Sequence, residues 1–352
     1  MDIRHDWKYS EVSQLYDMPL LDLVYKAAGI HREFHDSKQV QISSLVSIKT
    51  GGCPEDCSYC PQAARYHTDV EAQKLMKPED VISQAKKAKE GGASRMCLGA
   101  AWREVRDNRD FDNVLEMVRG INEMDMEVCC TLGMLNDEQA QRLKDAGLYA
   151  YNHNIDTSEE KYEEIISTRT FNDRLDTHKS VRKAGVSLCS GGIIGLGEEK
   201  NDRINMLITL ANYPKHPESV PINTLVPVEG TPLAENDRVP SWDLIKMVSI
   251  ARIMMPKSAV RLSAGRLELS DEAQAMCFMA GANSIFAGET LLTTDNPEFK
   301  ADKILFKNLG LSPKMPFEDG EQPVVNERYK ENSAKAKMEA RVREWKKEMA
   351  SK

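Results

Sequence analysis

A short apolar segment rich in β-branched residues recurs eight times along this 352-residue chain, and a helical stretch separates each segment from the next. Regular alternation of strands and helices favours a parallel sheet, because each helix carries the chain back to the start of the next strand. Eight units predict an α/β protein with a closed (β/α)8 barrel of the TIM type, the alternative being an open, doubly wound sheet. The predicted strands are residues 44–48, 95–99, 127–132, 149–154, 187–194, 221–226, 260–264 and 284–287.

Some helix ends can also be predicted between these strands. Pro78 suits the first turn of a helix, and Gly91 is a plausible stop for it. Asn136 can cap the next helix but one, with Gln139 placed to complete a capping box.

The chain is expected to have three parts. Residues 41–312 form the predicted barrel. Residues 1–40 are predicted to be an N-terminal helical extension, with Leu23 and Val24 on its apolar face. Residues 313–352 begin with several prolines and end in a highly charged run, which predicts a helical or flexible tail on the surface.

Composition narrows the class of protein. The chain is 41% hydrophobic and 29% charged, with a formal net charge of −8, an ordinary globular balance that disfavours nucleic-acid or anionic membrane surfaces. Its first residues carry mixed charges rather than the apolar core of a signal peptide, and no run approaches the roughly 18 apolar residues of a membrane span. We therefore expect a soluble, cytoplasmic protein, in which the eight cysteines stay reduced.

Three of the cysteines are clustered directly after the first predicted strand. Cys53, Cys57 and Cys60 lie on the loop at the mouth of the barrel, where enzymes of this fold place their chemistry. Three thiolates can hold three corners of a four-iron cluster, and no fourth cysteine lies nearby, so one iron is predicted to be open to another ligand. A structural zinc site is the alternative, although zinc normally takes four protein ligands.

A second group of residues occurs once per strand, at intervals of roughly 30 residues, the repeat of a barrel unit. Because successive strand residues point to opposite faces, an inward Cys129 requires an outward Cys130, which we interpret as a buried apolar residue. The same alternation lets the whole group face one central cavity. Its members are Cys97, Cys129, Asn154, Cys189, Asn223 and Arg261.

These motifs resemble a known family. The cysteine motif, with the aromatic Tyr59 before its last cysteine, is similar to the signature of the radical S-adenosylmethionine superfamily, and residues 95–100, 129–133 and 260–266 resemble the biotin synthases. The resemblance implies a 4Fe–4S cluster whose open iron binds S-adenosylmethionine, and an auxiliary 2Fe–2S cluster. The implied ligands are Cys53, Cys57 and Cys60 for the first, and Cys97, Cys129, Cys189 and Arg261 for the second. A protonated guanidinium has no acceptor, so charge neutralisation is the alternative role for Arg261.

The same resemblance assigns cofactor and substrate contacts. Those implied for S-adenosylmethionine are Tyr59, Asn154, Asp156, Arg174, Ile193 and Val226. Asp156 suits the ribose hydroxyls, and an ordinary surface ion pair is the alternative role for Arg174. Asn154 and Asn223 are implied to bind the ureido ring of dethiobiotin. The glycine-rich run 191–198 is expected to let the backbone approach a ligand closely.

The activity implied by the family is insertion of sulfur into dethiobiotin, the last step of biotin biosynthesis, with the auxiliary cluster as sulfur donor. A homodimer and a small, flavodoxin-like electron donor are implied as well. No acid–base catalytic residue is expected, because two unactivated C–H bonds are broken by cofactor radicals. Two rivals stay open: a hydrogenase-cofactor maturase of the same barrel type, and a non-catalytic iron–sulfur electron carrier.

Overall fold

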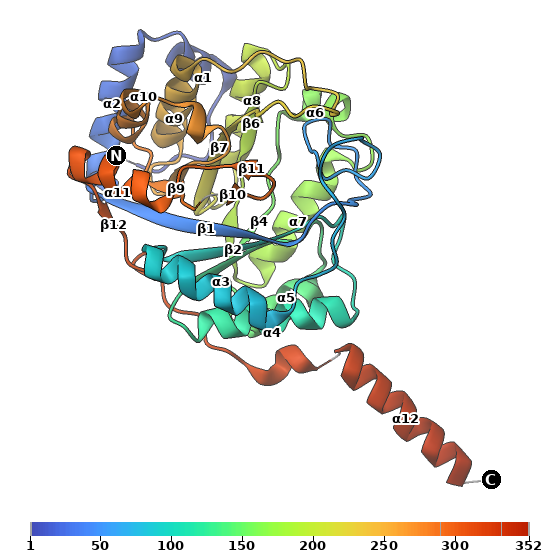
Figure 1. Cartoon of the computed structure of the whole chain (residues 1–352). Coiled ribbons are helices and arrows are strands. Elements are labelled where there is room, and N and C mark those ends of the chain that lie inside the picture. Colours follow the sequence, from blue (N-terminus) through green and yellow to red (C-terminus); the bar gives the residue numbers. More distant parts are fainter. Residues whose placement is uncertain (1, 289, 332, 351–352) are drawn as a thin grey trace.

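The computed structural model describes residues 2–288, 290–331 and 333–350. Its main sheet is an all-parallel barrel, closed because β1 pairs with both β2 and β9 (Figure 1). The predicted eightfold barrel is confirmed. Its strands are β1 (Gln39–Lys49), β2 (Arg95–Ala100), β3 (Glu127–Thr131), β4 (Ala150–Asn152), β5 (Ser187–Cys189), β6 (Gly192–Ile194), β7 (Ser219–Thr224), β8 (Ala259–Leu262) and β9 (Ser284–Phe286).

The fifth position of the barrel differs from the expected single strand over residues 187–194. β5 pairs with β4 and meets β7 at Cys189 and Ser219, whereas β6 pairs with β7 alone. The strand is interrupted around Gly191, where a Cβ atom would lie 1.9 Å from the carbonyl oxygen of Pro221. The two backbones approach too closely there for a regular ladder, so the strand is split.

Helices surround the barrel and cover its outer face (Figure 1). Asn136 caps α5 by accepting from the Gln139 amide at 2.9 Å, and the Gln139 side chain accepts from the Asn136 amide at 3.1 Å, so the predicted capping box is confirmed. α3 begins at Pro78 as predicted, and its left-handed cap is Gly92, one position beyond the predicted stop. The helices of this layer are α3 (Pro78–Gly91), α4 (Arg109–Asn122), α5 (Asp137–Asp145), α6 (Glu159–Ile165), α7 (Phe171–Lys183), α8 (Lys200–Ala211), α9 (Ser241–Met254), α10 (Asp271–Met279) and α11 (Phe299–Leu309).

Two helices precede the barrel, α1 (Tyr9–Tyr16) and α2 (Leu20–Phe34). α2 packs against α9, and α1 packs against α8 and α9. Leu23 and Val24 of α2 are buried in this contact, which anchors the N-terminal extension to the helical layer.

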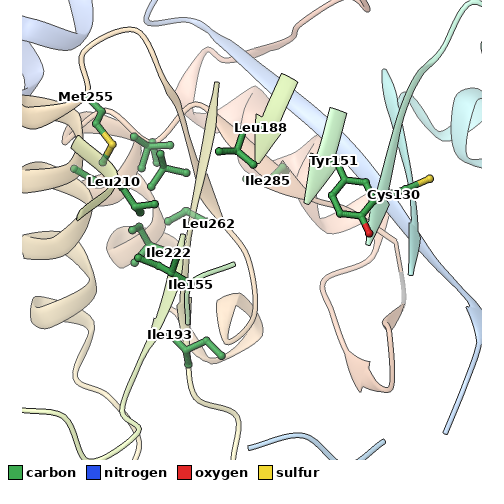
Figure 2. Packing of buried hydrophobic residues seen from close by; sticks show 14 of the residues in the cluster. Cys130, Tyr151, Ile155, Leu188, Ile193, Leu210, Ile222, Met255, Leu262 and Ile285 are labelled. Atoms are coloured by element: carbon green, nitrogen blue, oxygen red, sulfur yellow. The ribbon is translucent and has the colours of Figure 1, made fainter. Parts of the chain in front are cut away.

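The hydrophobic core lies between the strands and the helices. Figure 2 shows outward side chains from successive strands, including Cys130, Tyr151, Leu188, Ile222 and Leu262, each at most 1% exposed. Burying an aliphatic side chain of this size stabilises the fold by about 1.5–3 kcal/mol. This layer is therefore the main source of the barrel's stability.

A second, smaller cluster lies inside the barrel. Cys97, Cys129, Ala150 and Phe286 pack together, apart from the outer core. The neighbours Cys129 and Cys130 therefore face opposite sides of the sheet, and the predicted alternation is confirmed.

The chain ends with a segment that crosses beneath the barrel. β12 (Ser312–Pro313) pairs with β1 at Gln39 and Val40, at the start of that strand. The chain then runs past α4 and α5 to a short helix, Glu327–Lys330, and we call residues 312–331 the strap. Beyond it, α12 (Ala334–Ala350) projects away from the barrel (Figure 1). Within the described residues, no helix has the length and apolar character needed to cross a membrane.

Candidate active site

One cavity opens at the carboxyl ends of the strands and reaches into the barrel. It brings together residues from the loop after β1 and from most of the strands. Predicted residues lining it are Cys53, Cys57, Tyr59, Cys60, Cys97, Cys129, Asn154, Asp156, Arg174, Ile193, Asn223, Val226 and Arg261. Cys189 adjoins this set, because its Sγ lies 3.2 Å from Nδ2 of the lining residue Asn152.

The loop that carries the first three cysteines is held by backbone and carboxylate bonds. Cys53 donates its amide to Gln62 O at 2.9 Å, and the Cys60 amide donates to Cys57 O at 2.9 Å, which closes a tight turn. The Asp56 carboxylate accepts from the backbone amides of Ser167 and Thr168 at 3.0 and 3.1 Å. Burial raises the pKa of Asp56, but hydrogen bonds from the Ser167 and Thr168 hydroxyls, together with these two amide bonds, outweigh burial and lower the pKa overall. The loop is thereby tied to the segment between α6 and α7.

The three thiols fit a cluster better than a single ion. Among the described residues, no three His, Cys, Asp or Glu side chains are arranged to hold one metal ion. Cluster ligands each bind a different iron, so they need not meet at one point. Burial raises the pKa of Cys57 to about 11 and of Cys60 to about 12, and an iron cluster would favour the thiolates instead.

Arg169 is a site residue that sequence reasoning missed. Its Nη2 lies 3.9 Å from Cys57 Sγ, and its Nε lies 3.7 Å from the buried carboxylate of Glu55. The side chain is 7% exposed, and among the described residues Nε has no hydrogen-bond partner. Arg169 follows α6 rather than a strand, so the strand period gave no signal for it. It places a positive charge beside the loop that carries Cys53, Cys57 and Cys60.

The inner cysteines lie deeper in the barrel. Cys97 and Cys129 are register partners on β2 and β3, and Cys189 is the register partner of Asn152. The pKa of Cys97 is lowered by a hydrogen bond with Cys129 and by the nearby guanidinium of Arg261, against the effect of burial. Three thiols next to a cation form a suitable site for an anionic iron–sulfur cluster.

Each nitrogen of the Arg261 guanidinium has a separate neighbour. Nε donates to Ser284 Oγ at 2.8 Å, Nη2 donates to Gln41 Oε1 at 3.0 Å, and Nη1 lies 3.9 Å from Cys189 Sγ. The guanidinium also sits over the ring of Phe286, 4.8 Å from its centroid. The side chain is thus fixed on three sides, with one edge presented to the cysteines.

At the mouth, Asp156 and Arg174 form a buried ion pair with each other. The Arg174 Nε also donates to the Tyr162 hydroxyl at 2.9 Å, so this arginine is not a surface residue. Asn154 lies beside them, and its Oδ1 accepts from the Gly191 amide at 3.2 Å. Asp156 has a positive φ of 67°, an uncommon conformation for a residue other than glycine, which aims its side chain into the site.

Asn223 and Ile193 are neighbours across β6 and β7, in direct register. The Asn223 Nδ2 donates to Gly192 O at 2.9 Å, and its Oδ1 accepts from the Ala264 amide at 3.2 Å. An amide side chain has two N–H donors and two acceptor lone pairs, so one of each is left for a ligand.

Two glycines of the glycine-rich run lie in close contact with other parts of the protein. A Cβ at Gly191 would collide with Pro221 O, and one at Gly192 would lie 2.0 Å from Met206 Sδ on α8. These two glycines are required by close packing within the protein. The expected close approach of this run to a ligand stays a prediction.

Comparisons with known proteins agree with this geometry. The profile of the Radical SAM superfamily matches residues 47–211, and that of the Biotin and Thiamin Synthesis associated domain matches residues 221–312. The biotin synthase of Cytophaga hutchinsonii is 61% identical over 324 residues, which cover 92% of this chain and 96% of that protein. The mitochondrial biotin synthase of Arabidopsis thaliana is 57% identical over 314 residues, covering 89% of this chain and 83% of that one.

Solved structures show the same fold at much lower identity. Methylornithine synthase has a TM-score of 0.74 at 18% identity, covering 87% of this chain and 94% of its own. The [FeFe]-hydrogenase maturase HydG also has a TM-score of 0.74, at 17% identity, covering 87% of this chain and 72% of its own. These likenesses establish the barrel alone, whereas the close relatives establish the family. The chain belongs to the biotin synthase family of the radical S-adenosylmethionine superfamily.

Proposed function

We propose that this protein converts dethiobiotin to biotin by radical insertion of sulfur, as a sulfurtransferase. The observation that carries the proposal is one cavity in which a three-cysteine loop at the rim faces two deeper cysteines and an arginine, with a third deep cysteine adjoining them. Identity of about 60% to curated biotin synthases over most of the chain supports it. When bound, a 4Fe–4S cluster and S-adenosylmethionine supply 5′-deoxyadenosyl radicals, and a 2Fe–2S cluster supplies the sulfur.

At the rim, Cys53, Cys57 and Cys60 are the proposed ligands of the 4Fe–4S cluster. Their spacing leaves one iron for S-adenosylmethionine. The contacts proposed for this cofactor are Tyr59, Asn154, Asp156, Arg174, Ile193 and Val226, all of which line the cavity. Polar atoms for the ribose and for the amino acid end thus come from the segment after β4 and from α7, while Ile193 offers an apolar surface to the adenine.

Deeper in the barrel, Cys97, Cys129, Cys189 and Arg261 are the proposed ligands of the 2Fe–2S cluster. Arg261 is oriented by Ser284 and Gln41 so that Nη1 faces Cys189. The hydrogen bonds of Nε and Nη2 fix the plane of the guanidinium and therefore the position of Nη1.

Between the two centres, Asn154 and Asn223 are proposed to bind the ureido ring of dethiobiotin. This places the substrate's carbon atoms between the source of the radical and the source of sulfur. The protein then has to bind, orient and exclude water rather than transfer protons, so no side chain acts as a general acid or base.

A hydrogenase-cofactor maturase would have the same barrel. The inner ligand set and the close relatives support the biotin synthase activity instead. An electron carrier would need neither an open cluster corner nor a cofactor pocket. A homodimer and a small electron-donor protein are part of the proposal by family relationship.

The test compares two cysteine variants of anaerobically reconstituted protein, given S-adenosylmethionine, a reductant and dethiobiotin. Cys57→Ala is expected to abolish 5′-deoxyadenosine and biotin together. Cys189→Ala is expected to retain measurable 5′-deoxyadenosine while biotin falls below detection. Cofactor cleavage without biotin in the unaltered protein would favour the maturase, and absence of cleavage would favour the carrier.

A further inference from the structure

A layer of polar side chains lies directly beneath the inner cysteines. Arg95 and Glu127 come two residues before Cys97 and Cys129 on β2 and β3, so they point to the same inner face one layer lower. Gln41 of β1 joins them there. We call these three residues the floor layer; Gln41 is 4%, Arg95 5% and Glu127 2% exposed.

The floor layer is centred on the carboxylate of Glu127. Its Oε2 accepts from Arg95 Nε at 2.7 Å and from Gln41 Nε2 at 3.0 Å. Its Oε1 accepts from the backbone amide of Phe317 at 2.9 Å. A buried carboxylate with three such donors is a strong and directional anchor.

Gln41 connects that anchor to Arg261. Its Nε2 must donate to Glu127, and its Oε1 accepts from Arg261 Nη2 at 3.0 Å and from Ser284 Oγ at 3.2 Å. A carboxylate at one end and a guanidinium at the other allow only one orientation of the amide. The position of Arg261 therefore depends on Glu127, although the two side chains are not in contact.

The strap covers this layer from below. The Phe317 ring meets Tyr149 edge-on, with centroids 5.6 Å apart, and Tyr149 packs against the inner cluster that contains Cys97 and Cys129. Phe317 has a positive φ of 64°, which turns its amide toward Glu127. This conformation is unfavourable for an aromatic residue and persists only where the surroundings hold it.

We propose that the strap closes the compartment of the inner cluster from below. We also propose that Glu127 is a positioning residue, which holds Arg261 in place through Gln41. This inference rests on the proposed function, since it assumes a cluster between the inner cysteines and Arg261. The strap shields the cluster from below, and its contact at Phe317 keeps the arginine in its binding position.

The test measures how fast a chelator removes each cluster from the anaerobic, reconstituted full chain, by visible absorption and iron content. Phe317→Pro removes the amide donor and cannot adopt a positive φ. We expect it to lose the inner cluster at least tenfold faster than the unaltered protein, while loss of the 4Fe–4S cluster, an internal reference, is unchanged. The matched control is Tyr329→Phe, which removes only a 2.9 Å bond to Glu116 at the far end of the strap and should match the unaltered protein.

Glu127→Gln provides a second variant in case Phe317→Pro does not fold. It keeps the size of the side chain, but the new amide can either donate or accept a hydrogen bond. The Gln41 amide can then flip by 180° and no longer has to direct its oxygen at Arg261. We expect faster loss of the inner cluster and a changed absorption spectrum of that cluster. The melting temperature falls as well, because Arg95 loses its buried ion-pair partner, so an unchanged rate of loss of the 4Fe–4S cluster is the control for general destabilisation. Equal rates of loss in the altered and unaltered proteins, or equal acceleration in Tyr329→Phe, would overturn the inference. Unaltered protein that never assembles an inner cluster would instead refute the proposed function.

Discussion

Cys129 and Cys130 are adjacent thiols with different surroundings. Cys129 belongs to the small cluster inside the barrel, whereas Cys130 is fully buried in the outer core beside Tyr151. Burial raises the pKa of Cys130, which disfavours the reactive thiolate. At this scale, function depends on which face of one strand a sulfur atom occupies.

The pair offers a direct test. Cys129→Ala should prevent assembly of the inner cluster, because it removes a proposed ligand. Cys130→Ala should retain both clusters and lower the free energy of unfolding by about 1 kcal/mol, the cost of a small cavity in the core. Iron content and thermal melts distinguish the two. Loss of the inner cluster in Cys130→Ala but not in Cys129→Ala would instead show that Cys130 is the ligand and Cys129 is the structural residue.

Residues on strands could be predicted because the alternation of a strand and the repeat of a barrel fix where side chains point. Cys97, Asn223 and Arg261 were placed in one cavity on those grounds, and they line one cavity. Asn154 lines it too, although it lies two residues beyond the end of β4 and not on the strand itself, where it was predicted. Arg169 could not be found this way. Its position depends on how the loop between α6 and α7 folds back onto Glu55, which no local pattern encodes.

At the scale of the elements, the break between β5 and β6 positions part of the site. Gly191 lies against the carbonyl of Pro221, and the chain then resumes as β6, where Ile193 pairs in register with Asn223. The sequence predicted one strand here because only three small residues separate Leu188 and Cys189 from Ile193 and Ile194. The break follows from a backbone contact with β7, which is distant in sequence.

A substitution at this break should therefore be costly. In Gly191→Ala the new Cβ would lie 1.9 Å from Pro221 O, and we expect a loss of about 3 kcal/mol or more of unfolding free energy, with weaker binding of S-adenosylmethionine. Gly29→Ala is the control, since nothing lies within 4 Å of a Cβ at this exposed position of α2. It should stabilise the protein by about 0.5–1 kcal/mol. Thermal melts measure the stability of both variants. An unchanged stability of Gly191→Ala would show that the backbone between β5 and β6 can shift to make room for the new Cβ atom.

At the scale of the whole molecule, the C-terminal region divides into two parts with different relations to the barrel. The strap is bonded along its length, from Phe317 at Glu127 to Asn326, whose amide donates to Asp145 O at 2.7 Å. Proline-rich, charged sequence gave no reason to expect this, because the contacts are made largely by backbone atoms of the strap. By contrast, α12 extends from the barrel (Figure 1).

Truncation should separate these parts. A chain that ends at residue 334 loses nearly all of α12 but keeps the strap, and we expect its unfolding free energy to change by less than about 0.5 kcal/mol, with both clusters retained. A chain that ends at residue 311 lacks the strap and should lose the inner cluster preferentially. Melting temperature and iron content report the result. Equal cluster loss in the two truncations would assign the effect to α12.

The pairing of β1 with β9 joins residues 41–43 to residues 284–286. These strands cannot meet until most of the polypeptide has left the ribosome, and closing such a long loop is slow relative to local folding. Before that moment the inner thiols and Arg261 have no common enclosure. If these residues hold the proposed 2Fe–2S cluster, its iron and sulfide can be loaded into an enclosed site only after the barrel has closed.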